Sequence, residues 1–135
     1  MRAYVLDASA VLDLLENGRG AGRVEQILTS AHRRESTVSI SVMNWGEVFY
    51  NLWQNHGEEA ARNGIARLSR TLIEIVPVDK EQALKAAEIK AFHKLSFVDC
   101  VAAALAELRN SILVTADRDF QKLGRRIQVL WLVRS

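Results

Sequence analysis

The chain has 135 residues, the length of one ordinary domain, and 49% of them are hydrophobic, which is enough to bury a full core. With 25% charged residues, seven glycines and one proline, the composition excludes a disordered tail and a collagen-like repeat. The single cysteine, Cys100, excludes an internal disulfide, and Asp7 interrupts the N-terminus before a signal-peptide core could form. No apolar run approaches the roughly 18 residues of a membrane span, so we expect one cytoplasmic domain over residues 1–135 with no membrane association.

Short apolar runs alternate along the chain with longer segments in which apolar residues recur every three or four positions. The expected elements, in chain order, are a strand at 3–6, helices at 10–16 and 24–34, a strand at 37–40, helices at 42–54 and 58–71, a strand at 73–78, helices at 80–94 and 96–109, a strand at 112–114, a short helix at 119–123 and a strand at 129–133. Strands that alternate with helices form parallel sheets through right-handed crossovers. The sequence therefore predicts an α/β fold: a central parallel sheet of about five strands with helices on both faces.

Two acids come shortly after predicted strands. Asp7 comes after the first strand and Asp117 after the fourth, and at either place an acid commonly serves only as the N-cap of the next helix. In a parallel sheet, however, the functional crevice lies beyond the carboxyl ends of the strands, so these two distant residues become neighbours. Two like charges in one crevice raise each other's pKa unless a cation lies between them.

A third acid, Asp99, stands in a helix that is apolar on nearly every side, which is typical of a buried helix. One explanation is a capping box, because Ser96 and Asp99 have the required spacing, although Asp has a shorter arm than the usual Glu or Gln. The other explanation is a packed functional site, since small residues at helical spacing from Asp99 allow close approach of a neighbouring element. These are Ala102, Ala103 and Ala106.

A fourth acid, Glu47, has an ambiguous position on its helix. The main apolar stripe of this helix consists of Trp45, Val48, Phe49, Leu52 and Trp53. Glu47 points nearly opposite to it, as an exposed glutamate would. A second stripe of Met43, Gly46, Glu47 and Tyr50 indicates a helix that is covered on two sides, with Gly46 allowing close contact beside the acid. Periodicity leaves both interpretations open.

Other candidate groups are weaker. The three histidines, His32, His56 and His93, lack the spacing of metal ligands, so we expect them on the surface. Cys100 has no histidine partner in the sequence pattern and is expected in the core.

Four segments together resemble the PIN-domain ribonucleases, and most closely the VapC-like toxins of type II toxin–antitoxin systems. The segments are Val5–Leu12, the helix of Glu47, Leu95–Ala104 and Ile112–Phe120, and their order and spacing also match. One departure is Asn110, where many relatives carry glycine before the fourth strand. Asparagine tolerates the left-handed conformation, so the turn is expected to survive.

The resemblance implies a metal-dependent endoribonuclease in which Asp7, Glu47, Asp99 and Asp117 hold Mg²⁺ or Mn²⁺. It further implies that the hydroxyls of Ser9 and Thr115 support this quartet, and that Asp119 is an additional acid. Carboxylate oxygens are the ligands that such hard cations prefer, and a metal-activated water would hydrolyse the RNA phosphodiester bond. The implied partners are an RNA substrate and an antitoxin protein. A homodimer is expected for a different reason: Trp45, Phe49, Leu52 and Trp53 form a heavier aromatic stripe than the core of one domain needs.

Basic residues that flank these motifs are candidates for holding the RNA backbone, although each alone is compatible with an ordinary solvated charge. They are Arg19, Arg23, Lys94 and Arg118, with Lys122, Arg125 and Arg126 close by. Two alternatives stay open: a phosphotransferase with an aspartyl nucleophile, which would want an acid where Ser9 stands, and a catalytically inactive PIN-like RNA-binding or assembly module.

Overall fold

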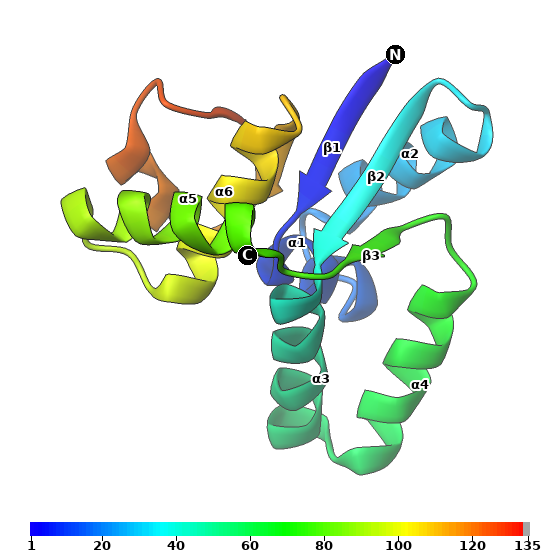
Figure 1. The fold of residues 1–135 in the computed structure, drawn as a ribbon. Helices are drawn as coiled ribbons and strands as arrows, with labels where there is room; N and C mark the ends of the chain where they lie inside the picture. The colour runs from blue at the N-terminus through cyan, green and yellow to red at the C-terminus, as the bar shows by residue number, and fades with distance from the viewer. Residues whose placement is uncertain (134–135) are drawn as a thin grey trace.

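The computed structural model describes residues 1–133 and contains one five-stranded parallel sheet in the order β3-β2-β1-β4-β5. The strands are β1 (Arg2–Leu6), β2 (Ser36–Ser41), β3 (Glu74–Val76), β4 (Ile112–Thr115) and β5 (Gln128–Trp131). The helices are α1 (Ala8–Leu15), α2 (Ala21–His32), α3 (Val42–His56), α4 (Glu58–Ser69), α5 (Lys80–Phe92), α6 (Phe97–Leu108) and the 3-10 helix η1 (Arg118–Leu123). The α/β prediction, including the five parallel strands, is therefore confirmed (Figure 1).

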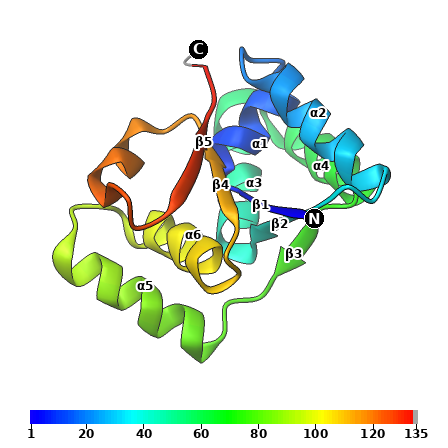
Figure 2. The same ribbon diagram turned by 90° about the horizontal axis from the view of Figure 1, so that it is seen from above.

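Helices cover both faces of the sheet, because successive strand residues point to opposite sides. In β1, Tyr4 and Leu6 pack into a core formed with α1 to α4, whereas Val5 packs into a second core formed with α5, α6 and η1. Figure 2 shows these two groups of helices on opposite sides of the strands. The central strand is thus buried on both faces, and the ends of β1 and β4 lie inside the molecule rather than at its rim.

The two edge strands are shorter than the sequence pattern predicts. The strand expected at 73–78 forms only at Glu74–Val76, and the one expected at 129–133 forms at Gln128–Trp131. Each pairs with a single neighbour, and Pro77, which lacks a backbone N–H, follows β3 directly. Because each edge strand has a neighbour on one side only, fewer hydrogen bonds hold its end residues in the extended conformation.

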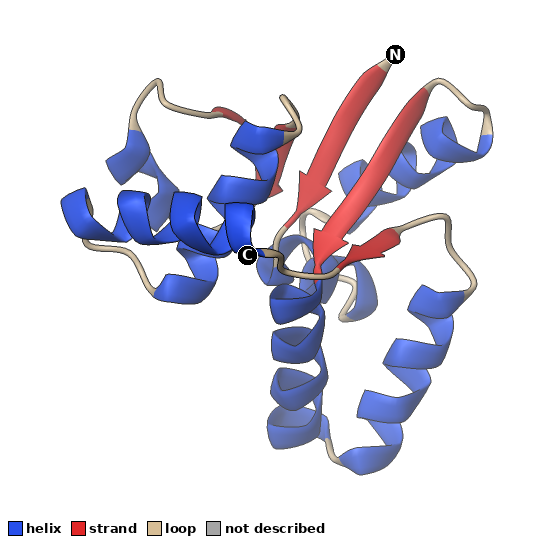
Figure 3. Ribbon diagram, viewed as in Figure 1, coloured by secondary structure: helices blue, strands red, loops and turns tan. Residues whose placement is uncertain are grey.

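Helices α3 and α4 form a hairpin that projects from the carboxyl end of β2 (Figure 3). Leu52 is buried, and Trp45 and Phe49 pack partly buried against the first core, so most of the aromatic stripe is accounted for within the chain. Trp53 is 41% exposed, and the Arg62 guanidinium lies 5.7 Å from the centre of its ring. Within residues 1–133, none of the helices has the length and apolar character needed to cross a membrane.

Candidate functional site

The carboxyl ends of the neighbouring strands β1 and β4 bring together two segments that are far apart in the sequence. Leu6 pairs with Val114, and the amide of Asp7 donates to the Val114 carbonyl at 3.2 Å. Thr115 is the last residue of β4, and Asp117 follows two positions later. The prediction that Asp7 and the Asp117 loop become neighbours is therefore met by the pairing of these strands.

Asp7 is the centre of a network of hydroxyl groups. Its Oδ1 accepts hydrogen bonds from the Ser9 hydroxyl at 2.7 Å and from the Ala10 amide at 2.9 Å, while its Oδ2 accepts one from the Thr115 hydroxyl. The Ser9 hydroxyl also accepts a bond from the Ala116 amide at 2.9 Å. Asp7 is thus the N-cap of α1, as the simplest interpretation required, but its second oxygen is bound across the sheet, which a cap does not need.

The Asp7 carboxyl is 3% exposed, and this burial raises its pKa to about 6. Hydrogen bonds from Thr115, Ser9 and Ala10 favour the charged form and oppose the rise, and the nearby charge of Asp99 adds to it. A carboxylate held in this way is partly stripped of water and electrostatically uncompensated. A bound cation would restore the balance.

Asp99 lies in the first turn of α6, whose N-cap is Ser96. The Ser96 hydroxyl accepts from the Asp99 amide at 3.2 Å, so the serine half of the predicted capping box is present. Burial is the main cause that raises the pKa of the Asp99 carboxyl to about 6, and the charges of Asp117, Glu47 and Asp119 raise it further. These three acids belong to two other parts of the fold, so their influence on Asp99 brings α3, α6 and the segment after β4 to one place.

Glu47 is half-buried rather than fully solvated, and its carboxylate has a specific partner. The Asn44 side chain donates from Nδ2 to Glu47 Oε1 at 3.1 Å. Gly46 has open space where a Cβ would lie, so the close approach expected beside the acid does not occur there. The sequence analysis did not single out Asn44. The feature that could have identified it is a polar amide on the same helical face as Val48 and Leu52.

The segment after β4 holds the other two acids. Asp117 Oδ1 accepts the Asp119 amide at 2.9 Å and so caps η1, while the Asp117 amide donates to the Thr115 hydroxyl at 2.9 Å. The side chain of Asp119 is 61% exposed and lies 3.8 Å from Lys122 Nζ. Asp117 therefore caps η1, and its charge also raises the pKa of Asp99.

The donor set fits a hydrated divalent cation better than a preformed cage. Within the described residues, no three His, Cys, Asp or Glu side chains lie in an arrangement that could by itself hold a metal ion. Mg²⁺ typically binds through one or two carboxylates and keeps several waters, so a site for it does not need three protein ligands in place. Carboxylate oxygens with raised pKa values and supporting hydroxyl groups suit that chemistry.

The basic residues near these motifs differ in what holds them. Arg19, Arg23, Lys94 and Arg125 are exposed. Arg118 donates to the Leu132 carbonyl at 3.0 Å and lies 4.9 Å from the centre of the Trp131 ring, which fixes it against β5. The guanidinium of Arg126 binds Glu107 at 2.9 Å and Glu88 at 2.7 Å, so it ties η1 and its following loop to α5 and α6.

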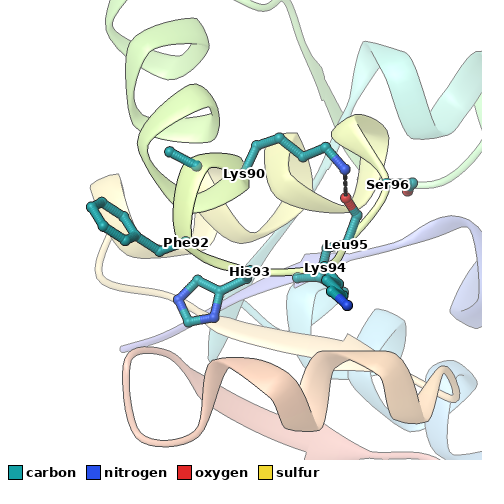
Figure 4. A pocket seen from close by; sticks show the side chains of 7 residues that line it. Lys90, Phe92, His93, Lys94, Leu95 and Ser96 are labelled. Carbon is teal, nitrogen blue, oxygen red and sulfur yellow. Dashed lines mark hydrogen bonds between the residues drawn. The ribbon is translucent and has the colours of Figure 1, made fainter.

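A surface hollow of about 580 Å³ lies at the junction of α5 and α6, lined by residues 90–96. Lys90 Nζ donates to the Leu95 carbonyl at 2.6 Å (Figure 4), and Lys122 Nζ donates to the Lys94 carbonyl at 2.9 Å. The hollow ends at Ser96, and none of the four acids lines it. The two lysines therefore fix the backbone that leads into α6 and Asp99.

Of the three histidines expected on the surface, His32 and His56 are exposed, whereas His93 is partly buried. His56 Nε2 lies 2.7 Å from Glu16 at the far end of α3. Cys100 is buried in the second core, as expected for a core residue.

Comparison with known proteins gives a family and a set of structural neighbours. A sequence model of the PIN domain matches residues 4–126. The fold is similar to VapBC2 from Rickettsia felis bound to a promoter DNA fragment, at 14% identity and a TM-score of 0.78 over 97% of this chain and 99% of that one. It is also similar to DNA-bound VapBC from Salmonella typhimurium, at 20% identity and a TM-score of 0.76 over 96% and 98% of the two chains.

A third neighbour is VapC20 from Mycobacterium tuberculosis, described as a toxin that cleaves the sarcin-ricin loop. It is 22% identical with a TM-score of 0.72 over 90% of this chain and 95% of that one. No curated protein matches the chain.

Proposed function

Because this chain belongs to the PIN-domain family, we propose that it is a Mg²⁺- or Mn²⁺-dependent endoribonuclease and the toxin of a toxin–antitoxin pair. The observation that carries this proposal is the meeting of carboxylates from three parts of the fold around Asp99, together with the buried Asp7 at the end of β1. The neighbour that cleaves the sarcin-ricin loop supports RNA as the substrate. The whole chain, residues 1–135, would act as one PIN domain in the cytoplasm.

In this proposal the cation is held by the carboxylates of Asp7, Glu47, Asp99 and Asp117. The bound ion supplies two things: a water of lowered pKa as nucleophile, and positive charge against the phosphate that is attacked. The donor set contains only hard oxygen atoms, which matches Mg²⁺ and Mn²⁺ and requires no histidine.

The hydroxyl groups orient the carboxylates. Ser9 and Thr115 donate to different oxygens of Asp7, which leaves the remaining lone pairs of Asp7 pointing in fixed directions. Thr115 also accepts from the Asp117 amide, so one hydroxyl sets the position of two acids. Asp119, which is mostly exposed and also raises the pKa of Asp99, is an auxiliary acid at the rim.

The RNA backbone needs cations around this acidic centre. The exposed residues Arg19, Arg23 and Lys94 are the candidates for phosphate contacts. Arg118 follows Asp117 directly and is held by the Leu132 carbonyl, so it would present a preordered guanidinium rather than a flexible one.

An antitoxin and a second copy of the chain complete the proposal. The neighbours VapBC2 and VapBC are complexes of this type, which supports the antitoxin partner. Met43, Tyr50 and Trp53 are 43%, 51% and 41% exposed along α3. Apolar side chains exposed next to Glu47 support a homodimer that uses this helix.

The test is cleavage of a purified RNA in Mg²⁺, in Mn²⁺ and in EDTA. Wild-type protein should cleave with either cation and stop in EDTA, and Asp7→Asn and Asp99→Asn should each retain less than about a tenth of the wild-type rate while staying folded. Cleavage that persists in EDTA, or either variant near the wild-type rate, would contradict the assignment. RNA binding without cleavage would favour the inactive-module alternative.

A further inference from the structure

An amide side chain is buried in the helix that carries Glu47. Asn44 is 1% exposed and lies on the inner face of α3 with Val48 and Leu52. Asparagine is a poor residue for a helix, and burying a polar group is unfavourable unless it is hydrogen-bonded. Its place is the first turn of α3, immediately after β2 ends, so it stands at the same end of the sheet as the acids.

The orientation of this amide is determined by its neighbour. Asn44 Nδ2 lies 3.1 Å from Glu47 Oε1, and a carboxylate only accepts hydrogen bonds, so the amide nitrogen must face it and the oxygen must face away. Asn44 Oδ1 is then buried, and no residue of the described chain donates to it. A buried acceptor without a partner destabilises the folded state, and a residue with a purely structural role would have no reason to retain it.

We propose that Asn44 is a positioning residue of the cation site. Its Nδ2 holds the Glu47 carboxylate in place for the cation, and its Oδ1 is left as an acceptor for a water molecule. The inference rests on the proposed function, because it takes Glu47 as one of the cation's ligands. Partners of this kind fix a ligand's rotamer before the ion arrives, and their loss typically lowers metal affinity or activity about 10- to 100-fold.

The variant that separates positioning from structure is Asn44→Leu. Leucine has the same heavy-atom skeleton and continues the apolar face of Val48 and Leu52, but it has no donor for Glu47 and no acceptor for water. If Asn44 served the fold alone, this variant would be as stable as wild type or more stable, with an unchanged response to Mn²⁺. The matched control is Asn51→Ala, which removes an amide that donates to the Glu47 backbone carbonyl at 2.9 Å instead of its carboxylate.

The primary measurement is the Mn²⁺ concentration that gives half of the maximal rise in melting temperature, starting from protein in EDTA. For Asn44→Leu this concentration should rise about 10-fold or more, with metal-free stability equal to or above that of wild type. Its kcat for RNA cleavage should fall by a similar factor while KM stays within about two-fold. Asn51→Ala should respond to Mn²⁺ as wild type does.

The results that would overturn the inference are equally specific. An unchanged Mn²⁺ midpoint in Asn44→Leu, or a wild-type protein whose melting temperature does not respond to Mn²⁺, refutes it. If Asn44→Leu does not fold, Asn44→Ala decides by the same midpoint. If wild type responds to Mn²⁺ but cleaves no RNA, the nuclease proposal fails, and the midpoint of Asn44→Leu still decides the role of Asn44.

Discussion

Replacing Asp7 by asparagine removes a buried negative charge and keeps the shape of the side chain. The pKa of this carboxyl is about 6 in the folded protein and near 3.8 without burial, so the folded state binds its proton more tightly than the unfolded state. The contribution of Asp7 to stability is therefore complete below pH 4 and is lost as the pH rises through about 6. Relative to the limit in which Asp7 is protonated in both states, its ionisation lowers the free energy of unfolding by about 3 kcal/mol at pH 7 and by about 0.5 kcal/mol at pH 4.

The free energy of unfolding of Asp7→Asn, minus that of wild type, should accordingly rise by about 2.5 kcal/mol between pH 4 and pH 7. Carboxyl groups that do not interact with Asp7 cancel in this difference because both proteins contain them, whereas the repulsion between Asp7 and Asp99 is absent from the variant and contributes to the rise. A constant offset from the altered bonds to Ser9 and Thr115 also cancels, since only the pH dependence is compared. Urea unfolding at several pH values in EDTA measures the difference, with equal m-values as the check that both proteins unfold alike.

A difference between the two proteins that stays flat from pH 4 to pH 7, or falls, would refute the reasoning. Such a result would mean that the hydrogen bonds from Ser9, Ala10 and Thr115 offset the burial of Asp7 completely. The carboxylate would then have no electrostatic need for a cation.

Three further predictions concern other parts of the molecule. Mg²⁺ or Mn²⁺ should raise the melting temperature and EDTA should reverse the rise, whereas Asp99→Asn should show a smaller metal response and a metal-free protein more stable by about 1 kcal/mol; equal metal responses in both proteins would contradict a shared cation. Asn110 has φ 50°, so Asn110→Ala should lower the free energy of unfolding by about 1 kcal/mol in a urea melt, while Asn110→Gly should not. The exposed pair of Arg109 and Glu74, at 2.9 Å, should contribute under about 1 kcal/mol, so a larger and salt-independent loss in Arg109→Gln would contradict its surface character.

The sequence was sufficient to predict that the strand ends next to Asp7 and Asp117 are neighbours. Asp7 and Asp117 follow strands whose apolar runs are short and well bounded, and the parallel topology places the ends of β1 and β4 side by side. Asn110 was expected to adopt the left-handed conformation, and it does. These predictions depend only on strand boundaries and local backbone preference.

The periodicity of the sequence could not predict which side chains interact in the folded protein. Glu47 lies opposite the main apolar stripe of its helix and within the second one, and only the packing of α3 beside α6 gives its charge an effect on Asp99. Asn44 was overlooked because one amide in an apolar stripe carries no signal about its partner. Arg118 and Arg126 were grouped with the exposed basic residues, but their partners lie in β5, α5 and α6, which linear spacing does not show.

The hydrogen bonds to the Asp7 carboxylate also determine how much of the chain must be synthesised before the acidic site can form. Ser9 and Thr115, which both bind this carboxylate, are separated by 106 positions in the chain. β1 is made first but lies in the middle of the sheet, and one of its two neighbours, β4, is made last but one. A nascent chain that has not reached Thr115 thus lacks one of the three groups that donate to the Asp7 carboxylate, and the only one that binds its Oδ2 among the described residues. The acidic centre therefore cannot be complete before β4 and Asp117 have been made, and a fragment that ends before them does not carry it.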